Sequence, residues 1–130
     1  MTPTDAKARK AIPLTTGVLD YFPNALMAVA ECSRAGNEQH NPGKPLHWYR
    51  SKSGDEADAL LRHLIDRGSF DTDGIRHSAK VAWRALALLQ KEIEAERSAD
   101  LALLSAHVAP GPVVAVTPVT PAPALEELDE

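Results

Sequence analysis

The sequence predicts an all-α fold: a small bundle of three to four helices, with a long functional loop between the first two and a disordered Pro-rich C-terminal tail. Three segments carry apolar residues at helical spacing, and a Pro-rich stretch follows them near the C-terminus. The chain has 130 residues and 44% apolar residues, which is room for one domain with a small core. We therefore expect the helices to account for most of the ordered chain.

The first predicted helix runs from about Phe22 to Ala35. Pro23 lies in its first turn, where a missing N–H costs nothing, and Gly36 is a plausible C-terminal stop. Apolar residues surround most of this helix, so it should be buried by neighbouring helices or by another subunit. Residues 18–21 could add a short helical turn before it.

The second predicted helix spans about Asp55 to Arg67 and ends at Gly68. Acidic residues occupy its first turn, where the helix dipole favours anions. Its predicted apolar face consists of Ala57, Leu60, Leu61, Leu64 and Ile65.

The third predicted helix is the longest, from about Asp73 to Arg97, and should be the spine of the bundle. It carries a heptad-like apolar seam. That seam comprises Ile75, Ala79, Ala82, Leu86, Leu89 and Ile93. Residues 98–106 either extend this helix or form a fourth segment.

Both ends of the chain differ from this central region. Residues 1–13 look flexible, and the ordered all-α domain should occupy residues 14–105. Residues 106–130 form a tail rich in Pro, Val and Thr that ends in the acidic sequence LEELDE. Repeated prolines prevent a helix there and favour an extended chain.

Overall charge and cysteine content exclude several classes of protein. Fourteen basic against eighteen acidic residues make the chain mildly acidic, so we expect no direct binding to nucleic acid or to an anionic membrane. The single cysteine, Cys32, rules out an internal disulfide framework and suits a reducing compartment. No apolar run approaches the length of a membrane span, which together with the N-terminal sequence predicts a cytoplasmic protein.

The segment 36–52, GNEQHNPGKPLHWYRSK, is the strongest candidate for binding. It gathers histidines, aromatic residues and cations without a hydrophobic period, and long loops of this kind are usually functional. A structural role is the alternative: Trp48 and Leu46 would pack into the bundle, while His40 and His47 would hydrogen-bond the backbone.

A positive stripe follows the third predicted helix and could hold phosphates. Its members recur at intervals of three, four and seven residues, and they are His77, Lys80, Arg84 and Lys91. The alternative is an ordinary solvated face, or ion pairs to the acidic start of the second helix. Arg84 lies within an apolar run, so its charge should serve either a ligand or an internal carboxylate.

The acidic residues of the second helix offer a possible metal site. Asp55 and Asp58 lie one turn apart and could share Mg²⁺ or Mn²⁺, which prefer carboxylate oxygens. They are also ordinary helix-starting residues, and Asp58 can pair with Arg62 four residues later. His63 and Asp66 form a further pair at i, i+3.

Four stretches of the chain together resemble a known family. They are GVLDYFPNAL, GNEQHNPGKPLHW, DALLRHLID and DTDGIRHSAKVAWRALALLQ. These stretches are similar to the phage-associated N-terminal domain of dATP/dGTP diphosphohydrolase, over roughly Arg9 to Glu94. The resemblance implies an all-α protein of bacteriophage nucleotide metabolism. Family members are associated with hydrolysis of dATP and dGTP to the monophosphate and pyrophosphate, linked in some phages to replacement of adenine by 2-aminoadenine in DNA.

A catalytic hypothesis follows, in which a metal ion activates water to attack a nucleotide phosphate. The catalytic carboxylates would be Glu38, Asp55, Glu56 and Asp58, with Glu38, Asp55 and Asp58 as ligands of Mg²⁺ or Mn²⁺. The phosphate-binding residues would be Arg50, Lys52, His77, Lys80 and Arg84. The residues contacting base and sugar would be His40, Asn41, His47 and Trp48.

Two other functions fit the same sequence. The ExxE and ExxD metal motifs of the MazG-type all-α pyrophosphohydrolases do not lie at the corresponding places, so a nucleotide-binding or sequestering module without catalysis is one alternative. The other is an interaction protein that assembles through its apolar helices and uses the Pro-rich tail as a tether. In each case the surplus apolar surface predicts a homo-oligomer.

Overall fold

The computed structural model describes residues 2–107 and confirms the all-α prediction. The described chain contains the helices α1 (Ala6–Lys10), α2 (Pro23–His40), α3 (Glu56–Ile65) and α4 (His77–His107). Two single turns separate them, a π-helical turn at Thr15–Leu19 and a 3₁₀ turn at Arg50–Lys52. The chain divides into two compact units, Met1–Lys91 and Glu92–Glu130.

The first unit begins with a short helix and a π-helical turn. Asp5 caps α1, because its carboxylate accepts a hydrogen bond from the backbone N–H of Ala8 at 2.7 Å. The π-helical turn overlaps the short turn predicted for residues 18–21, and it closes with the N–H of Asp20 donating to the carbonyl of Thr15 at 2.8 Å. Helical structure thus starts within the segment predicted to be flexible.

Helix α2 starts where the sequence indicated and ends five residues later. Pro23 is its first residue, but Gly36 is not its stop. The glycines with positive φ are Gly43, Gly68 and Gly74, so Gly36 keeps the helical conformation. The helix continues to His40 because Asn37, the residue after Gly36, is buried and hydrogen-bonded to the following loop. Gly36 was therefore wrongly taken as the end of this helix.

Helix α3 lies close to its predicted position. Asp55 occupies the N-cap position, although its side chain bonds to other side chains and not to the helix backbone. Gly68, with φ of 85°, follows the end of the helix as predicted. The predicted apolar face is only partly covered, since Leu61 is 56% exposed and Ile65 is 77% exposed.

Helix α4 begins at His77, four residues after the predicted start. Gly74 has φ of 78°, which a right-handed helix cannot accommodate, and the backbone N–H of Asp71 donates to the carbonyl of Ile75 at 2.8 Å. A single antiparallel bridge also joins Phe70 and Arg76. These contacts hold residues 70–76 as a tight loop, so helical structure starts only after it.

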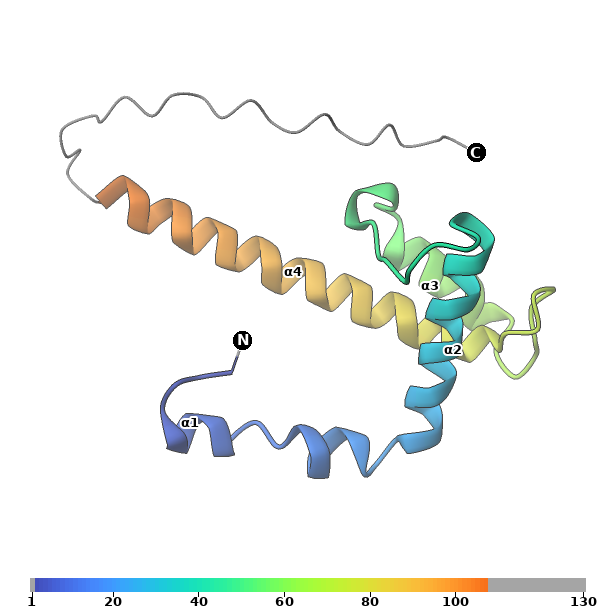
Figure 1. Ribbon diagram of the computed structural model, residues 1–130, viewed down its shortest axis with the longest axis horizontal. Helices are drawn as coiled ribbons and strands as arrows, with labels where there is room; N and C mark the ends of the chain where they lie inside the picture. The colour runs from blue at the N-terminus through green and yellow to red at the C-terminus, as the bar shows by residue number, and fades with distance from the viewer. Residues whose placement is uncertain (1, 108–130) are drawn as a thin grey trace. The chain divides into compact units, whose positions relative to one another are not determined.

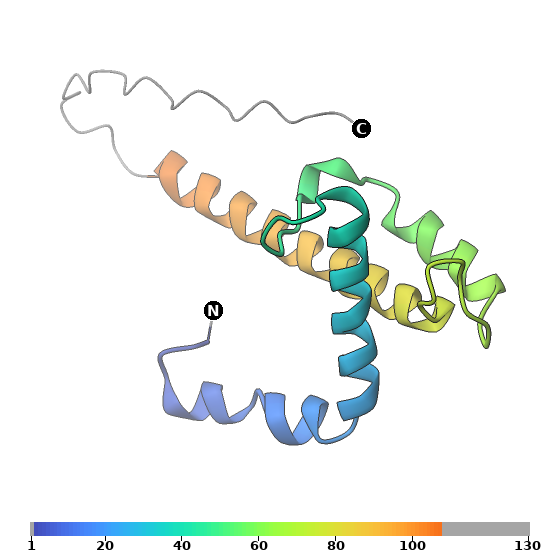
Figure 2. The same cartoon turned by 45° about the vertical axis from the view of Figure 1, so that its right-hand side comes forward.

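The core of the first unit is built from small side chains. Helices α2 and α3 both lie against the N-terminal part of α4 (Figures 1 and 2). Among the described residues, the buried apolar side chains are those of Ala59, Ala79 and Ala87, and no large side chain is fully buried. Close approach of the helices at alanine leaves the larger apolar residues at the edges of the contact.

In the second unit, residues 92–107 continue α4. Residues 98–106 therefore extend the third predicted helix, and of the predicted Pro-rich tail only Ala106 and His107 belong to the described chain. Leu101, Leu103 and Leu104 are between 62% and 66% exposed. Within residues 2–107, no helix is both long enough and apolar enough to cross a membrane.

Candidate functional site

A buried amide on α2 anchors the loop between α2 and α3. Asn37 is 8% exposed, and its Nδ2 donates to the carbonyl of Lys44 at 3.0 Å. Its Oδ1 accepts the backbone N–H of His47 at 3.3 Å. One side chain thereby fixes both limbs of the loop. Sequence reasoning missed Asn37 because it lies within the segment read as loop, where no helical period marked it.

Aromatic contacts then place the loop against α4. The rings of Trp48 and Trp83 meet edge to face, with centroids 5.7 Å apart. Trp83 Nε1 donates to Ser33 Oγ on α2 at 2.7 Å, so Trp83 joins α2, α4 and the loop. Of the two residues expected to pack into the bundle under the structural alternative, Trp48 is half-buried and Leu46 is 66% exposed.

Cationic and aromatic side chains alternate along the same loop. The Arg50 guanidinium lies 4.3 Å from the centroid of the Trp48 ring, and the Lys52 ammonium lies 4.8 Å from that of Tyr49. His47 contacts Tyr49 edge to face at 4.3 Å and is exposed. Such cation–π contacts hold positive charge beside flat apolar surface, a combination that suits a base and its phosphates.

The predicted binding residues His40 and Asn41 lie at the end of α2. His40 is the last residue of α2 and is exposed. Asn41 follows as the C-cap, and its backbone N–H donates to the carbonyl of Asn37 at 2.7 Å. The side chains of these two residues are thus near the start of the loop, while Trp48 and Arg50 lie near its end.

Ser53 links the end of the loop to the positive stripe on α4. Its Oγ accepts a hydrogen bond from Arg84 at 3.0 Å and donates one to Asp55 at 2.9 Å. Lys91 donates to the backbone carbonyl of Ser53. Arg84 is therefore partnered by a hydroxyl group, with its guanidinium also 5.5 Å from the centroid of Trp83.

The N-cap residue Asp55 and the first-turn residue Glu56 of α3 each pair with a cation. Glu56 is 5% exposed and accepts a hydrogen bond from Lys91 at 2.8 Å, while the exposed Asp55 pairs with Arg62 at 2.9 Å. The Lys91 hydrogen bond holds the pKa of Glu56 below its ordinary value, and the Arg62 hydrogen bond does the same for Asp55. Lys91 thus forms an ion pair with the acidic start of α3. Such a pair was the structural alternative to phosphate binding by the positive stripe.

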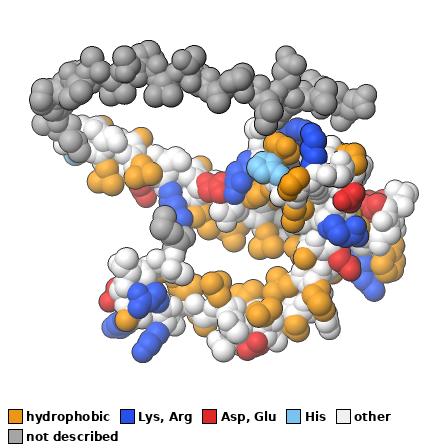
Figure 3. Space-filling model, in the orientation of Figure 1, with side chains coloured by type: hydrophobic (Ala, Val, Ile, Leu, Met, Phe, Trp, Pro, Cys, Tyr) orange, Lys and Arg blue, Asp and Glu red, His pale blue; other side chains and the backbone are white. Residues whose placement is uncertain are grey.

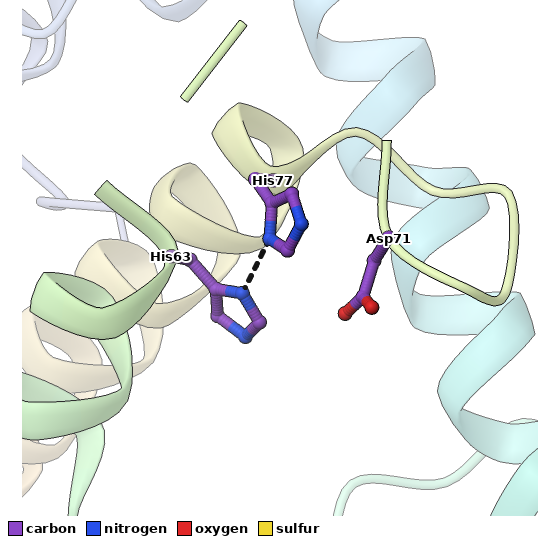
Figure 4. Close-up of side chains that lie close together, drawn as sticks. All are labelled: His63, Asp71 and His77. Atoms are coloured by element: carbon purple, nitrogen blue, oxygen red, sulfur yellow. Dashed lines mark hydrogen bonds between the residues drawn. The ribbon is translucent and has the colours of Figure 1, made fainter. Parts of the chain in front are cut away.

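The other two members of the stripe contact different elements: Lys80 contacts the loop that precedes α4, and His77 contacts α3. Lys80 contacts Asp71 at 2.6 Å and Asp73 at 2.7 Å. The Lys80 hydrogen bond lowers the pKa of Asp71 to about 2. Burial alone would lower the pKa of Lys80, but its two carboxylate partners outweigh burial and raise it. His77 Nδ1 lies 2.9 Å from His63 Nδ1 (Figure 4).

The four predicted catalytic carboxylates do not form one cluster. Glu38 lies near the end of α2 and Asp58 in the first turn of α3, and both are exposed. Within residues 2–107, a single group of three or more histidine, cysteine or acidic side chains has ligand atoms within 4.8 Å of one another, and it consists of His63, Asp71 and His77. Sequence reasoning missed this group because its members come from different elements.

Comparison with known families identifies the domain. The family model described as "dATP/dGTP diphosphohydrolase, N-terminal" matches residues 2–101. The chain belongs to this family. The match confirms the resemblance drawn from the sequence and extends it at both ends, from roughly Arg9–Glu94 to residues 2–101. No significant match to a curated protein or to a solved structure was found.

Membership in the dATP/dGTP diphosphohydrolase N-terminal family indicates a role in nucleotide metabolism. The matched residues include every side chain of the loop and of the positive stripe described above. Trp48, Arg50, Ser53 and Arg84 belong to one network of cation–aromatic contacts and hydrogen bonds that also includes Trp83; we refer to these four residues as the loop site.

Proposed function

We propose that this domain binds a purine deoxynucleoside triphosphate, such as dATP or dGTP, and serves its conversion to the monophosphate and pyrophosphate in the cytoplasm of a phage-infected bacterium. Family membership over residues 2–101 carries the proposal. The loop site supports it with aromatic surface, two guanidinium groups and a hydroxyl within one contact network.

In the loop site, the two arginines have separate roles. Arg50 lies over Trp48 and places its positive charge beside that aromatic ring, on which a base can stack. Arg84 uses one nitrogen for Ser53, and a guanidinium has five N–H donors, so it keeps donors for a phosphate oxygen. Lys52 and His47 both contact the Tyr49 ring. Lys52 adds a positive charge beside this surface, and His47 adds a polar imidazole ring.

Hydrolysis by this domain would require Mg²⁺ or Mn²⁺ held by Glu38, Asp55 and Asp58, which do not form one cluster within residues 2–107. The carboxylate donors suit these ions, but Asp55 and Glu56 are already paired with Arg62 and Lys91. A metal ion carrying the triphosphate would have to replace at least the exposed Arg62–Asp55 pair. The geometry favours nucleotide binding over completed catalysis in this domain, and a catalytic partner or a further domain would then supply the metal centre.

We further propose that the chain self-associates. Figure 3 shows hydrophobic side chains on the surface of the first unit, and the exposed ones include Leu14, Leu19, Phe22 and Met27. A core of three alanines buries little apolar surface for a domain of this size, so a second copy offers these side chains a partner. Sedimentation velocity should show an oligomer that Phe22→Glu with Met27→Glu dissociates, while Arg97→Ala leaves it intact.

The test of nucleotide binding and turnover uses the full chain. The purified protein is incubated with each dNTP and NTP in Mg²⁺ or Mn²⁺, with products followed by chromatography and phosphorus NMR. A thermal-shift series without metal runs beside it. Pyrophosphate with dAMP or dGMP would establish hydrolysis, and stabilisation without products would establish the binding module.

A matched set of variants assigns the binding to the loop site. Arg84→Gln and Trp48→Ala should each weaken purine deoxynucleotide binding about tenfold or more, since each removes one strong contact. Arg97→Ala removes a cation from the same helix outside the site and should bind normally. Absence of any nucleotide-dependent stabilisation in the folded wild-type protein would reject the proposal and favour the interaction protein.

A further inference from the structure

Two histidines and an aspartate converge outside the loop site. His63 lies near the end of α3, His77 is the first residue of α4, and Asp71 lies in the loop between these helices. Figure 4 shows the imidazole rings meeting, with the Asp71 carboxylate beside them. One ligand atom from each residue lies within 4.8 Å of the other two, and all three side chains are half-buried. The loop site and the carboxylates Glu38, Asp55 and Asp58 share no residue with this group.

The donor set differs in kind from a magnesium site. Two imidazole nitrogens and one carboxylate oxygen suit Zn²⁺ and the neighbouring first-row divalent ions, whereas Mg²⁺ prefers oxygen ligands alone. The imidazole nitrogens are 2.9 Å apart, and tetrahedral Zn²⁺ with bonds of 2.0–2.1 Å needs about 3.3 Å. A small rotation of either ring supplies the difference. Three protein ligands leave a fourth position for water or a substrate atom.

The two histidines have another possible arrangement, a direct hydrogen bond. At 2.9 Å one Nδ1 can donate to the other only if the rings adopt different tautomers. A metal ion between them removes this requirement, since both nitrogens then act as acceptors toward the ion. The two Nδ1 atoms already face each other. The hydrogen-bonded pair is therefore the arrangement expected for this site without its metal ion.

Lys80 is the main cation opposing a metal ion here. It contacts Asp71 Oδ2 at 2.6 Å, but it also contacts Asp73 Oδ2 at 2.7 Å, so it retains a carboxylate partner if Asp71 turns to a metal ion. Asp71 Oδ1 accepts the backbone N–H of Thr72 at 2.7 Å, which fixes the carboxylate and leaves a lone pair on each oxygen. Arg84 adds a more distant positive charge that acts on His63, and the Asp71 carboxylate acts on His63 in the opposite direction.

We propose that His63, Asp71 and His77 bind one first-row divalent transition-metal ion, best matched by Zn²⁺. The ion would join α3, the 70–76 loop and the start of α4 in the first unit. This site is independent of the proposed nucleotide binding, because it uses none of the loop-site residues.

The test measures metal binding by the full chain without nucleotide. After chelator treatment and dialysis, Zn²⁺ is titrated by calorimetry, and Co²⁺ is added to a parallel sample to record the visible absorption of a nitrogen- and oxygen-ligated ion. We expect one ion per chain and a higher unfolding temperature with Zn²⁺ than with chelator. Absence of stoichiometric Zn²⁺ binding to the folded protein would overturn the proposal.

Matched variants decide which residues bind the ion. His63→Gln, His77→Gln and Asp71→Asn should each abolish the Co²⁺ spectrum and the Zn²⁺-dependent stabilisation, while circular dichroism confirms that each variant is helical. The controls His40→Gln, His107→Gln and Cys32→Ser should bind one ion as before. Lys80→Gln should tighten Zn²⁺ binding, because it removes the opposing charge and leaves the ligands in place. Retained binding in His63→Gln combined with His77→Gln would place the ion elsewhere and refute the assignment.

Discussion

Lys91 of α4 donates a hydrogen bond to Glu56 of α3 at 2.8 Å, and Glu56 is only 5% exposed. The same ammonium group donates to the carbonyl of Ser53, so it also holds the residue that leads into α3. The charge of this buried carboxylate is therefore balanced by Lys91, which links the two helices.

Replacing Lys91 with Met should destabilise the fold by about 3 kcal/mol, because it leaves the carboxylate of Glu56 buried without its cation. Urea unfolding followed by circular dichroism measures the loss. Adding Glu56→Gln to Lys91→Met should recover part of it, since the amide carries no charge. Equal stability of Lys91→Met and wild type would show that water already solvates Glu56.

Stability should also fall at acidic pH through Glu56. Its pKa is lower in the folded chain than in the unfolded chain, so its contribution is complete above the ordinary glutamate pKa and is lost as pH falls through the folded value. Unfolding free energy measured against pH should therefore be flatter in Glu56→Gln than in wild type over the acidic range. Parallel pH profiles for the two proteins would contradict this.

Asn37→Ala should loosen the loop between α2 and α3, because it leaves the N–H of His47 and the carbonyl of Lys44 without their partner. We expect a loss of about 2 kcal/mol, and faster amide hydrogen exchange through residues 44–47. Asn24→Ala, at an exposed position early in α2, serves as the control. Unchanged exchange in the loop would mean that the Trp48–Trp83 contact alone holds it.

Two glycines should respond to alanine in opposite ways. Gly36 is helical and a Cβ there meets nothing within 4 Å, so Gly36→Ala should stabilise the fold by about 0.5–1 kcal/mol. Gly74 has φ of 78°, so Gly74→Ala should destabilise it by about 1–2 kcal/mol. Thermal unfolding of both variants checks the signs. Destabilisation by Gly36→Ala would indicate that α2 does end where the sequence suggested.

The helices were predictable because their apolar spacing is local information. Pro23 and Gly68 were interpreted correctly, since a first-turn proline and a terminal glycine act through their own backbone. The predictions that the first helix stops at Gly36 and that the third starts at Asp73 were wrong. Helix α2 passes Gly36 because Asn37 bonds to residues seven and ten positions away, and α4 starts late because Asp71 and Ile75 close a loop.

The candidate site was predictable only in part, for the same reason. Its residue types gathered in the 36–52 segment, and the structure brings Trp48 and Arg50 together there. Single residues such as Ser53 and Trp83 gain their roles from partners 20 or more positions away, at Arg84 and Ser33. The His63–Asp71–His77 group depends on how α3 meets α4, which no sequence spacing specifies.

The alanine core has a thermodynamic consequence. When the interior consists of methyl groups at Ala59, Ala79 and Ala87, folding of a single chain removes little apolar surface from water, so its heat-capacity change should be small for its length. Most of the heat-capacity change would then accompany association, when the exposed leucine, phenylalanine and methionine side chains are covered. The melting temperature should accordingly rise with protein concentration.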